Sequence, residues 1–321
     1  MNLRVRGILP LLAVMVILGP FAQAQPNVNV DSKAVNIWSD GTRLSGNLFW
    51  PKSAKEGEKL PAILLCHGWG GVKQHLNTTY APKFASEGYV VLAFDYRGWG
   101  ESDSRLVILG DAPKPDANNE ATVKVQMIRE LVDPFDQLRD IQGALNFLEG
   151  ESIVDTNRIG IWGTSMGGGL VIQTAIDDPR IKCVVSQVGA MDGRGAADTA
   201  GGGVEALHQR AIRRARGEEP PVPQGVDKVG ELRGTPYLER FVDYAPVTQV
   251  DGLKAPTLFI DAEKEELFDN KQHGGLAYEK IKDRVKSKYH LEPGITHYGI
   301  YRERYIQGSQ MAIEWFNENL K

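Results

Sequence analysis

The stretch RIGIWGTSMGG at Arg158–Gly168 decides how this sequence folds. Its first half is a short apolar run typical of a buried strand, and the following run, Leu170–Asp177, has a helical pattern. Between them Ser165 has small neighbours two positions away on each side, Gly163 and Gly167. A strand that turns so sharply into a helix needs small residues there and holds its central residue in a strained conformation. The segment therefore predicts a strand–turn–helix unit with Ser165 at the turn.

Strand-like and helix-like segments alternate along the rest of the chain. Continuous apolar runs typical of parallel strands covered on both faces are Ala62–Cys66, Tyr89–Phe94, Ile159–Trp162, Cys183–Val185 and Thr257–Ile260. Val35–Ser39 and Leu44–Trp50 predict a hairpin. Asp133 is a suitable N-cap for a helix over 134–150, and a last helix is expected at Met311–Leu320. This alternation predicts an α/β fold with a mostly parallel, doubly wound sheet.

Two stretches interrupt the alternation. Residues 104–132 contain two prolines and a pair of asparagines, and about 189–246 is richer still in glycine and proline, with a helical piece near 204–216. Long irregular insertions in compact domains are usually functional. We expect the first stretch at the edge or mouth of the sheet and the second to be an inserted cap.

The N-terminus has the pattern of a secretory signal. Met1–Arg6 carries two arginines and no acid, Gly7–Phe21 is apolar, and Ala22-Gln23-Ala24 supplies small residues two apart. The apolar run is short for a membrane span, which needs about 20 residues. We expect residues 1–24 to be removed and residues 25–321 to form a secreted or periplasmic domain without stable membrane association. An uncleaved anchor is the alternative.

Charge and cysteine content exclude several classes of function. The formal net charge of −4 comes from interspersed acids and bases, which gives no reason to expect nucleic acid as a partner. Cys66 and Cys183 both lie in strand-like apolar runs and are interpreted as buried free thiols. Neither paired cysteines nor an HExxH spacing occurs, so we expect no metal and no cofactor. Nothing in the sequence sets the oligomeric state.

A second glycine-rich segment, HGWGG at His67–Gly71, follows the predicted strand that ends at Cys66. Its glycines let backbone amides approach a bound group closely. Negative charge that develops on a carbonyl oxygen is stabilised by two preorganised N–H donors. We expect the backbone N–H groups of Trp69 and Met166 to form this oxyanion hole. Apolar surface around a substrate is expected from Trp69, Trp99 and Tyr298.

Five motifs in this order carry a resemblance to a known superfamily: HGWGG at His67–Gly71, DYRGWGES at Asp95–Ser102, RIGIWGTSMGG at Arg158–Gly168, PTLFIDAEKEEL at Pro256–Leu267 and PGITHYG at Pro293–Gly299. The chain resembles the α/β-hydrolases, nearest to the dienelactone-hydrolase and X-Pro-dipeptidyl-peptidase-like branches. The resemblance covers almost all of the chain after the signal. It implies an α/β-hydrolase fold with Ser165 as nucleophile, and a strand order that keeps Cys66 and Cys183 too far apart for a disulfide.

The base should follow the nucleophile in this fold, because the order is serine, acid, histidine. His273 comes too soon after the strand expected to carry the acid, and His290 falls within the expected last strand. His297 lies in a loop before the last helix, so we expect it to be the base. His67 precedes Ser165 and is interpreted as a structural residue of its glycine-rich loop.

The acid is expected in the loop after the strand Thr257–Ile260. Its candidates are Asp261, Glu263, Glu265, Glu266 and Asp269. The resemblance decides for Glu265, which stands where relatives carry aspartate, and Asp192 after the preceding strand is an alternative. These residues imply a serine hydrolase that cleaves small-molecule carboxylic esters through an acyl-enzyme. An exported X-Pro-type peptidase and a non-catalytic binding protein on the same fold are the alternatives.

Overall fold

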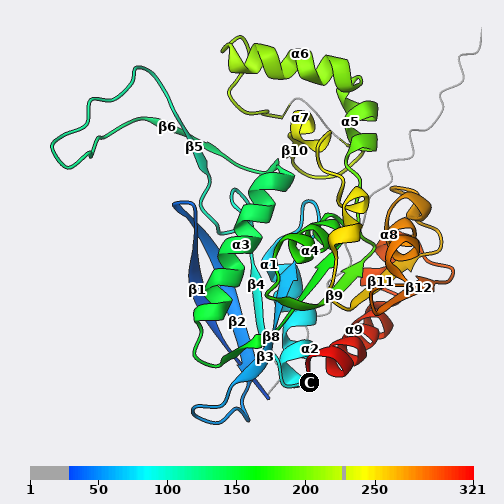
Figure 1. Ribbon diagram of the computed structural model, residues 1–321. Helices are drawn as coiled ribbons and strands as arrows, with labels where there is room; N and C mark the ends of the chain where they lie inside the picture. Colours follow the sequence, from blue (N-terminus) through cyan, green and yellow to red (C-terminus); the bar gives the residue numbers. More distant parts are fainter. Residues whose placement is uncertain (1–28, 226–228) are drawn as a thin grey trace, which may run out of the picture.

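The computed structural model describes residues 29–225 and 229–321, so the predicted signal segment lies outside the described residues. An eight-stranded sheet with strand order β1-β2-β4-β3-β8-β9-β11-β12 forms the centre of the molecule (Figure 1). Its strands are β1 (Val30–Ser39), β2 (Thr42–Pro51), β3 (Leu60–Cys66), β4 (Val90–Phe94), β8 (Val154–Thr164), β9 (Ile181–Gln187), β11 (Thr257–Ala262) and β12 (Ser287–Glu292). The two pairings of β2, with β1 and with β4, are antiparallel, and the other pairings in this sheet are parallel, which confirms the expected mostly parallel sheet.

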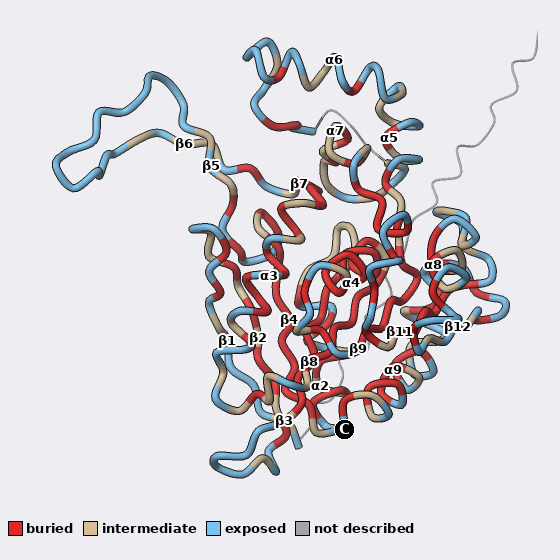
Figure 2. Tube along the Cα trace, viewed as in Figure 1, coloured by how far each residue is buried: buried red, intermediate tan, exposed pale blue. Residues whose placement is uncertain are grey.

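Helices cover both faces of the sheet. One hydrophobic core lies under α3 (Pro134–Gly150), α4 (Met166–Asp177) and α8 (Gly274–Ile281), and the other lies under α2 (Tyr80–Ser86) and α9 (Tyr305–Leu320). The short helix α1 (Lys73–Asn77) precedes α2. Figure 2 shows the central strands as an almost continuous buried layer. This arrangement explains why the strands read as unbroken apolar runs, because neither of their faces meets water.

Local sequence signals fix the ends of several elements. Asp40 and Gly41 both have positive φ, 47° and 77°, in the two-residue turn that joins β1 to β2. The side chain of Asp133 accepts hydrogen bonds from the N–H groups of Phe135 and Asp136 at the start of α3, which is the capping expected of that aspartate. The last helix begins at Tyr305, six residues before the predicted start at Met311.

The two irregular stretches meet above the carboxyl ends of the strands. The first contains β5 (Arg105–Ile108), β6 (Val125–Ile128) and β7 (Leu131–Val132). The stretch predicted as a cap contains α5 (Arg194–Gly201), α6 (Val204–Ala215), β10 (Thr235–Pro236) and α7 (Leu238–Phe241), and the short 3-10 turns η1 (Pro246–Thr248) and η2 (Val250–Gly252) lead from it to β11. β10 pairs with β7, so the cap segment is attached to the body through the other irregular stretch (Figure 1).

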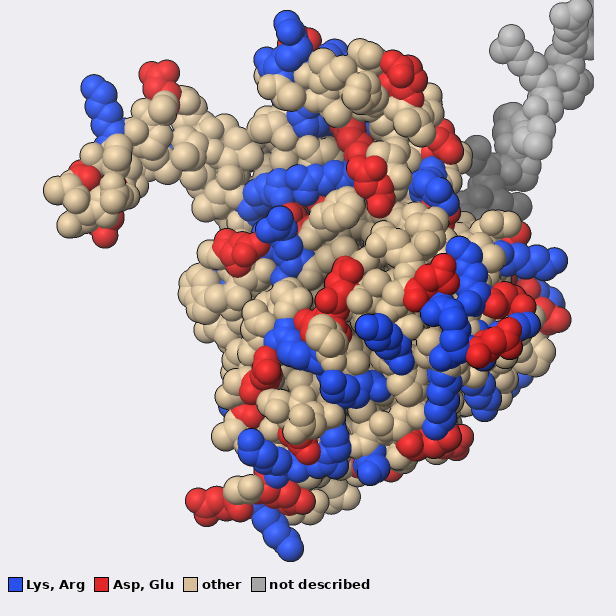
Figure 3. Space-filling view, viewed as in Figure 1, with Lys and Arg blue, Asp and Glu red and all other residues tan. Residues whose placement is uncertain are grey.

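Cys66 and Cys183 lie on β3 and β9, on either side of β8, and both are buried free thiols. Acidic and basic side chains are interspersed over the face shown in Figure 3, as the sequence pattern indicates. Within the residues that the structure describes, no helix combines the length and apolar character needed to cross a membrane.

Candidate active site

Ser165 occupies the sharp turn between β8 and α4. Its backbone has φ 56° and ψ −124°, a positive-φ conformation that is costly for a residue with a side chain. The Ser165 N–H donates to the carbonyl oxygen of Gln187 (2.9 Å), which attaches the turn to the end of β9. The turn leaves Ser165 partly exposed at the N-terminal end of α4, where the helix dipole favours negative charge. The predicted strand–turn–helix context of Ser165 is therefore present.

The glycines around Ser165 are required by close backbone packing. A Cβ atom at Gly163 would overlap the carbonyl group of Gly167, and one at Gly167 would overlap the carbonyl oxygen of Cys66. A Cβ atom at Gly68 would lie 2.8 Å from the Cβ of Ser165. The glycine-rich loop after β3 thus packs directly on the turn that carries the serine.

His297 and Glu265 form a buried pair. The Nδ1 atom of His297 lies 2.8 Å from Oε2 of Glu265, and each side chain is only 2% exposed. His297 begins the 3-10 turn η4 (His297–Tyr301) after β12, and Glu265 lies in the loop after β11. The other carboxylate oxygen of Glu265 accepts the N–H of Leu267 (3.0 Å). Because a carboxylate only accepts, Glu265 favours the His297 tautomer with its proton on Nδ1 and leaves Nε2 to accept a proton.

Two neighbouring acids hold the backbone of the same histidine loop. The carboxylate of Glu266 accepts the N–H of His297 (2.6 Å), and that of Glu263 accepts the N–H of Gly294 (2.7 Å). Three carboxylates of one loop thus contact the loop that carries His297. Of these three, Glu265 is the one that reaches the imidazole ring.

The remaining acid candidates have other partners. Asp192 pairs with Arg194 at 2.6 Å, and Asp269 accepts the N–H of Lys271 at the start of the 3-10 turn η3 (Asn270–Gln272). Asp261 is 1% exposed at the end of β11, and one of its oxygens has no hydrogen-bond partner in the part of the chain that the structure describes. Burial raises the pKa of the Asp261 carboxyl to about 7, and the nearby charge of Glu265 acts in the same direction.

Three other histidines, His67, His273 and His290, have partners of their own. His67 is buried, its Nδ1–H donates to the carbonyl oxygen of Gly68 (3.0 Å), and burial lowers its pKa to about 4. The N–H of Met191 donates to Nδ1 of His273 (2.8 Å), and burial lowers the pKa of that ring. His290 pairs with Glu292 on β12 at 2.7 Å. These contacts leave His297 as the histidine paired with the loop acid.

The expected oxyanion donors are free to bind a ligand. Met166 is the first residue of α4, and the first N–H groups of a helix have no acceptor within the helix. In the described part of the chain the backbone N–H of Trp69 donates to no protein group either. Across the same residues, Ser165 Oγ makes no direct hydrogen bond to His297, which is common for serine–histidine pairs before substrate binds.

The aromatic residues predicted to line the pocket differ in accessibility. Trp69 is partly buried, its indole N–H donates to the carbonyl oxygen of Arg233 (3.0 Å), and its ring lies 5.4 Å from that of Phe241 in the cap segment. Tyr298 is 44% exposed, with its ring 5.4 Å from that of His297. Both can contact a ligand near Ser165.

Trp99 does not line an accessible surface. It is 1% exposed, and its indole N–H donates to the carbonyl oxygen of Leu131 (3.0 Å). Gly234 packs so closely on the ring that a Cβ atom there would lie 2.6 Å from it. The prediction that Trp99 contacts substrate is therefore wrong in this structure, because the cap segment covers the ring.

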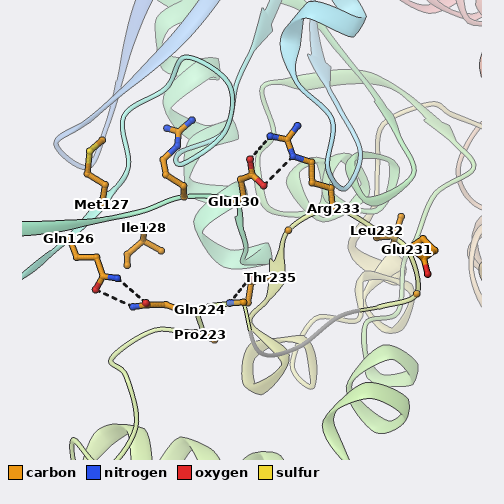
Figure 4. A pocket seen from close by; sticks show the side chains of 14 residues that line it. Gln126, Met127, Ile128, Glu130, Pro223, Gln224, Glu231, Leu232, Arg233 and Thr235 are labelled. Carbon is orange, nitrogen blue, oxygen red and sulfur yellow. Dashed lines mark hydrogen bonds and ion pairs between the residues drawn. The ribbon is translucent and has the colours of Figure 1, made fainter. Parts of the chain in front are cut away.

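A pocket of about 610 Å³ lies between β6 and the cap segment and is lined by residues 126–130, 223–225 and 230–235 (Figure 4). The side chains of Gln126 and Gln224 face one another across it, and Glu130 pairs with Arg233. Its lining residues do not include Ser165 or His297. It adjoins the glycine-rich loop after β3 through Arg233, whose carbonyl oxygen accepts the indole N–H of Trp69.

One contact at this site was not expected from the sequence. The hydroxyl of Tyr301, in η4, lies 2.7 Å from that of Thr164, and the buried side-chain amide of Gln187 donates to the same threonine oxygen (3.2 Å). Two features of the sequence could have indicated this contact: Thr164 lies inside the glycine motif next to Ser165, and Tyr301 follows His297 by four residues. Among the described residues no group of three metal-ligating side chains is placed to hold an ion.

A parallel sheet with the serine turn, histidine loop and acid loop at one edge defines the α/β-hydrolase class. Known structures agree: a hypothetical protein from Pseudomonas aeruginosa has a TM-score of 0.70 at 21% identity, covering 93% of this chain and 97% of that one. An acetyl xylan esterase from Paenibacillus has a TM-score of 0.60 at 20% identity, covering 91% and 86%.

Within this class the sequence identifies the family. Residues 44–204, half of the chain, match the dienelactone hydrolase family, and the chain belongs to it. An Escherichia coli protein described as an uncharacterized 31.7 kDa protein in the traX-finO intergenic region is 28% identical over 82% of this chain and 92% of its own length. The protein is thus a hydrolase of the α/β class.

Proposed function

We propose that the protein is a serine hydrolase that cleaves carboxylic esters through an acyl-enzyme. The observation that carries this proposal is the buried His297–Glu265 pair, on loops at the same sheet edge as the strained turn of Ser165. A serine hydroxyl is a weak nucleophile unless a neighbouring base takes its proton. A buried glutamate that orients the base and balances its positive charge is the third member of such a site.

In the first step Ser165 Oγ attacks the ester carbonyl carbon while His297 Nε2 takes the serine proton. The carbonyl oxygen becomes negatively charged and accepts hydrogen bonds from the N–H groups of Met166 and Trp69, which have no acceptor among the described residues. His297 then gives its proton to the leaving alcohol. Glu265 keeps the imidazole oriented and stabilises its charged form.

In the second step water attacks the acyl-enzyme, with His297 now acting as base for the water. The same two N–H donors stabilise the second oxyanion, and Ser165 leaves with the proton from His297. No metal or cofactor enters this proposal. Trp69 and Tyr298 are the aromatic side chains that would contact the acyl or alcohol part.

The test combines an active-site probe with a substrate panel. The folded protein should react with a fluorophosphonate probe at Ser165 and hydrolyse p-nitrophenyl esters, and the Ser165→Ala variant should do neither. Dipeptidyl and aminoacyl p-nitroanilides run beside the esters distinguish an esterase from a peptidase. Labelling with faster turnover of the anilides would identify a peptidase, and absence of labelling would identify a binding protein on this fold.

We also propose that the protein is exported and that residues 1–24 are its signal. The support is the arginine-bearing Met1–Arg6, the short apolar run after it and the small residues at Ala22-Gln23-Ala24. Intact-mass measurement of protein recovered from the periplasm or medium should show loss of this segment. A full-length product in the membrane fraction would identify an anchor instead.

A further inference from the structure

Residues 105–128 project from the body of the molecule as a short two-stranded ribbon, β5 and β6, that carries a long connecting loop, and we call this segment the arm (Figure 1). Its strands β5 and β6 are antiparallel, with Leu106 opposite Met127 and Ile108 opposite Val125. Because side chains alternate along a strand, these four residues share one face of the ribbon. Residues 105, 107, 126 and 128 share the other face.

The second face, which we call the inner face, is fixed to the cap segment. Ile128 packs with Leu131 and Val222, and Val107 lies against the same small core. The amide groups of Gln126 and Gln224 donate to one another at 2.8 and 3.2 Å (Figure 4). At the base of the arm Arg105 binds the carboxylate of Asp136. These contacts give the arm a defined direction relative to the body.

The outer face carries large apolar side chains that meet water. Leu106 is 56% exposed, Ile108 49% and Met127 57%, and Leu109 just beyond β5 is 41% exposed. Figure 2 shows the arm as mostly exposed, and Figure 3 shows its surface as largely uncharged outside the tip. An isolated two-stranded ribbon is marginally stable in water, and contiguous exposed apolar residues mark interaction surfaces.

We propose that a second copy of this chain covers the outer face and that the protein is a two-fold symmetric dimer joined through its arms. A two-fold interface uses the same patch on both subunits, so the patch must complement itself. The outer face does: its apolar side chains would pack on the same side chains of the partner. Among the described residues β5 and β6 form a sheet of two strands, so each strand has an outer edge at which a partner strand can bind.

The charges at the tip of the arm favour a second copy over other occupants. The tip carries both signs, all exposed: Asp111, Asp116 and Glu120 with Lys114 and Lys124. Antiparallel packing of two such tips can place acids of one against lysines of the other, whereas an anionic membrane or a nucleic acid requires an excess of cations.

The test is the mass of the protein in solution, measured by light scattering across a range of protein concentrations. The wild-type protein should have the mass of two chains. The Leu106→Glu/Met127→Glu double variant should have the mass of one, with an unchanged circular dichroism spectrum. The matched control is Ile306→Glu. Ile306 is an apolar residue outside the arm that is 67% exposed, so this variant should stay dimeric.

Three results would overturn the proposal. A wild-type protein with the mass of one chain at every concentration would leave no second copy to cover the face. A double variant that stays dimeric would place the interface elsewhere. A control variant that dissociates as readily as the double variant would show that the effect is not specific to the arm. None of these measurements depends on hydrolase activity, so they stand apart from the test of the proposed function.

Discussion

The hydroxyl of Tyr301 lies 2.7 Å from that of Thr164, which joins the turn that begins with His297 to the residue directly before Ser165. The two hydroxyls belong to residues 137 positions apart in the sequence, and their contact joins the two loops beside the proposed nucleophile and base. The amide of Gln187 donates to the same threonine hydroxyl, so the bridge is attached to the end of β9 as well. A hydrogen bond in this place can set the relative position of Ser165 and His297.

We expect Tyr301→Phe to lower kcat for ester hydrolysis by about 10- to 100-fold, because small misplacements of reacting groups have costs of this size. KM should change little, since the tyrosine does not contact substrate in the proposed mechanism. The measurement is steady-state kinetics of Tyr301→Phe, Thr164→Val and the double variant. If the hydrogen bond is the cause, the double variant should lose no more than either single variant. Tyr278→Phe, on α8 and outside the proposed site, is the matched control, and an equal loss there would contradict this explanation.

The acid can be assigned by comparing three glutamates of one loop. Glu265→Gln should lower kcat by about 10³- to 10⁴-fold, because an amide cannot balance the imidazolium charge. Glu263→Gln and Glu266→Gln should have much smaller effects, since a glutamine oxygen can still accept the backbone N–H groups that these residues bind. Asp192→Asn should also retain activity, because Asp192 pairs with Arg194. A collapse in one of these three with a near-normal Glu265→Gln would move the acid to that residue.

Gly68→Ala should impair both stability and activity. The added Cβ would lie 2.8 Å from the Cβ of Ser165 and 3.0 Å from the carbonyl oxygen of Thr164, so the glycine-rich loop after β3 must shift. Overpacking of this kind typically costs about 1–3 kcal/mol. Thermal unfolding and fluorophosphonate labelling measure the two effects. Gly150→Ala is the control, because a Cβ there meets nothing within 4 Å, and it should behave as wild type.

Asp261 should make the folded state less stable as the pH rises. Its pKa is raised from 3.8 to about 7, so between these values the folded protein keeps a proton that the unfolded chain has lost. The free energy of unfolding contributed by this group therefore falls across that window, by at most about 1.4 kcal/mol for each pH unit. His67, with its pKa lowered to about 4, acts in the opposite direction, so a difference measurement is needed.

That measurement is denaturant unfolding of Asp261→Asn and wild type from below pH 4 to above pH 7. The neutral amide has no proton to lose, so the stability of the variant relative to wild type should increase with pH and level off once Asp261 is ionised. A difference that stays constant over the whole range would show that Asp261 titrates normally in the folded protein.

The sheet and the turn of Ser165 could be predicted from the sequence because their signals are local. Continuous apolar runs indicate strands that are covered on both faces. The glycines two residues before and after Ser165 indicate a tight turn, because a larger residue at either position would overlap the backbone. Glu265 came from position within a family pattern, and its pairing with His297 agrees with that choice. Its role as the acid stays a prediction.

The failures involve contacts between distant segments. Trp99 follows a strand near the site, and nothing in its motif shows that Gly234, far along the chain, covers its ring. The contact between Tyr301 and Thr164 could not be predicted either, because the two residues are 137 positions apart in the sequence. The outer face of the arm could not be predicted either. A stretch with proline and asparagine gives no strand pattern, and only the register of β5 and β6 shows which side chains share a face.

The two buried thiols, Cys66 and Cys183, can serve as a natural probe of unfolding. Burial raises the pKa of Cys66 to about 12 and that of Cys183 further, so neither forms a reactive thiolate while the sheet is intact. They lie on β3 and β9, which flank the strand that leads to Ser165. A thiol reagent applied to the native protein would therefore be consumed only when the centre of the sheet opens. Its rate of uptake would time that opening without any engineered label, and the fold itself should be indifferent to reducing agents.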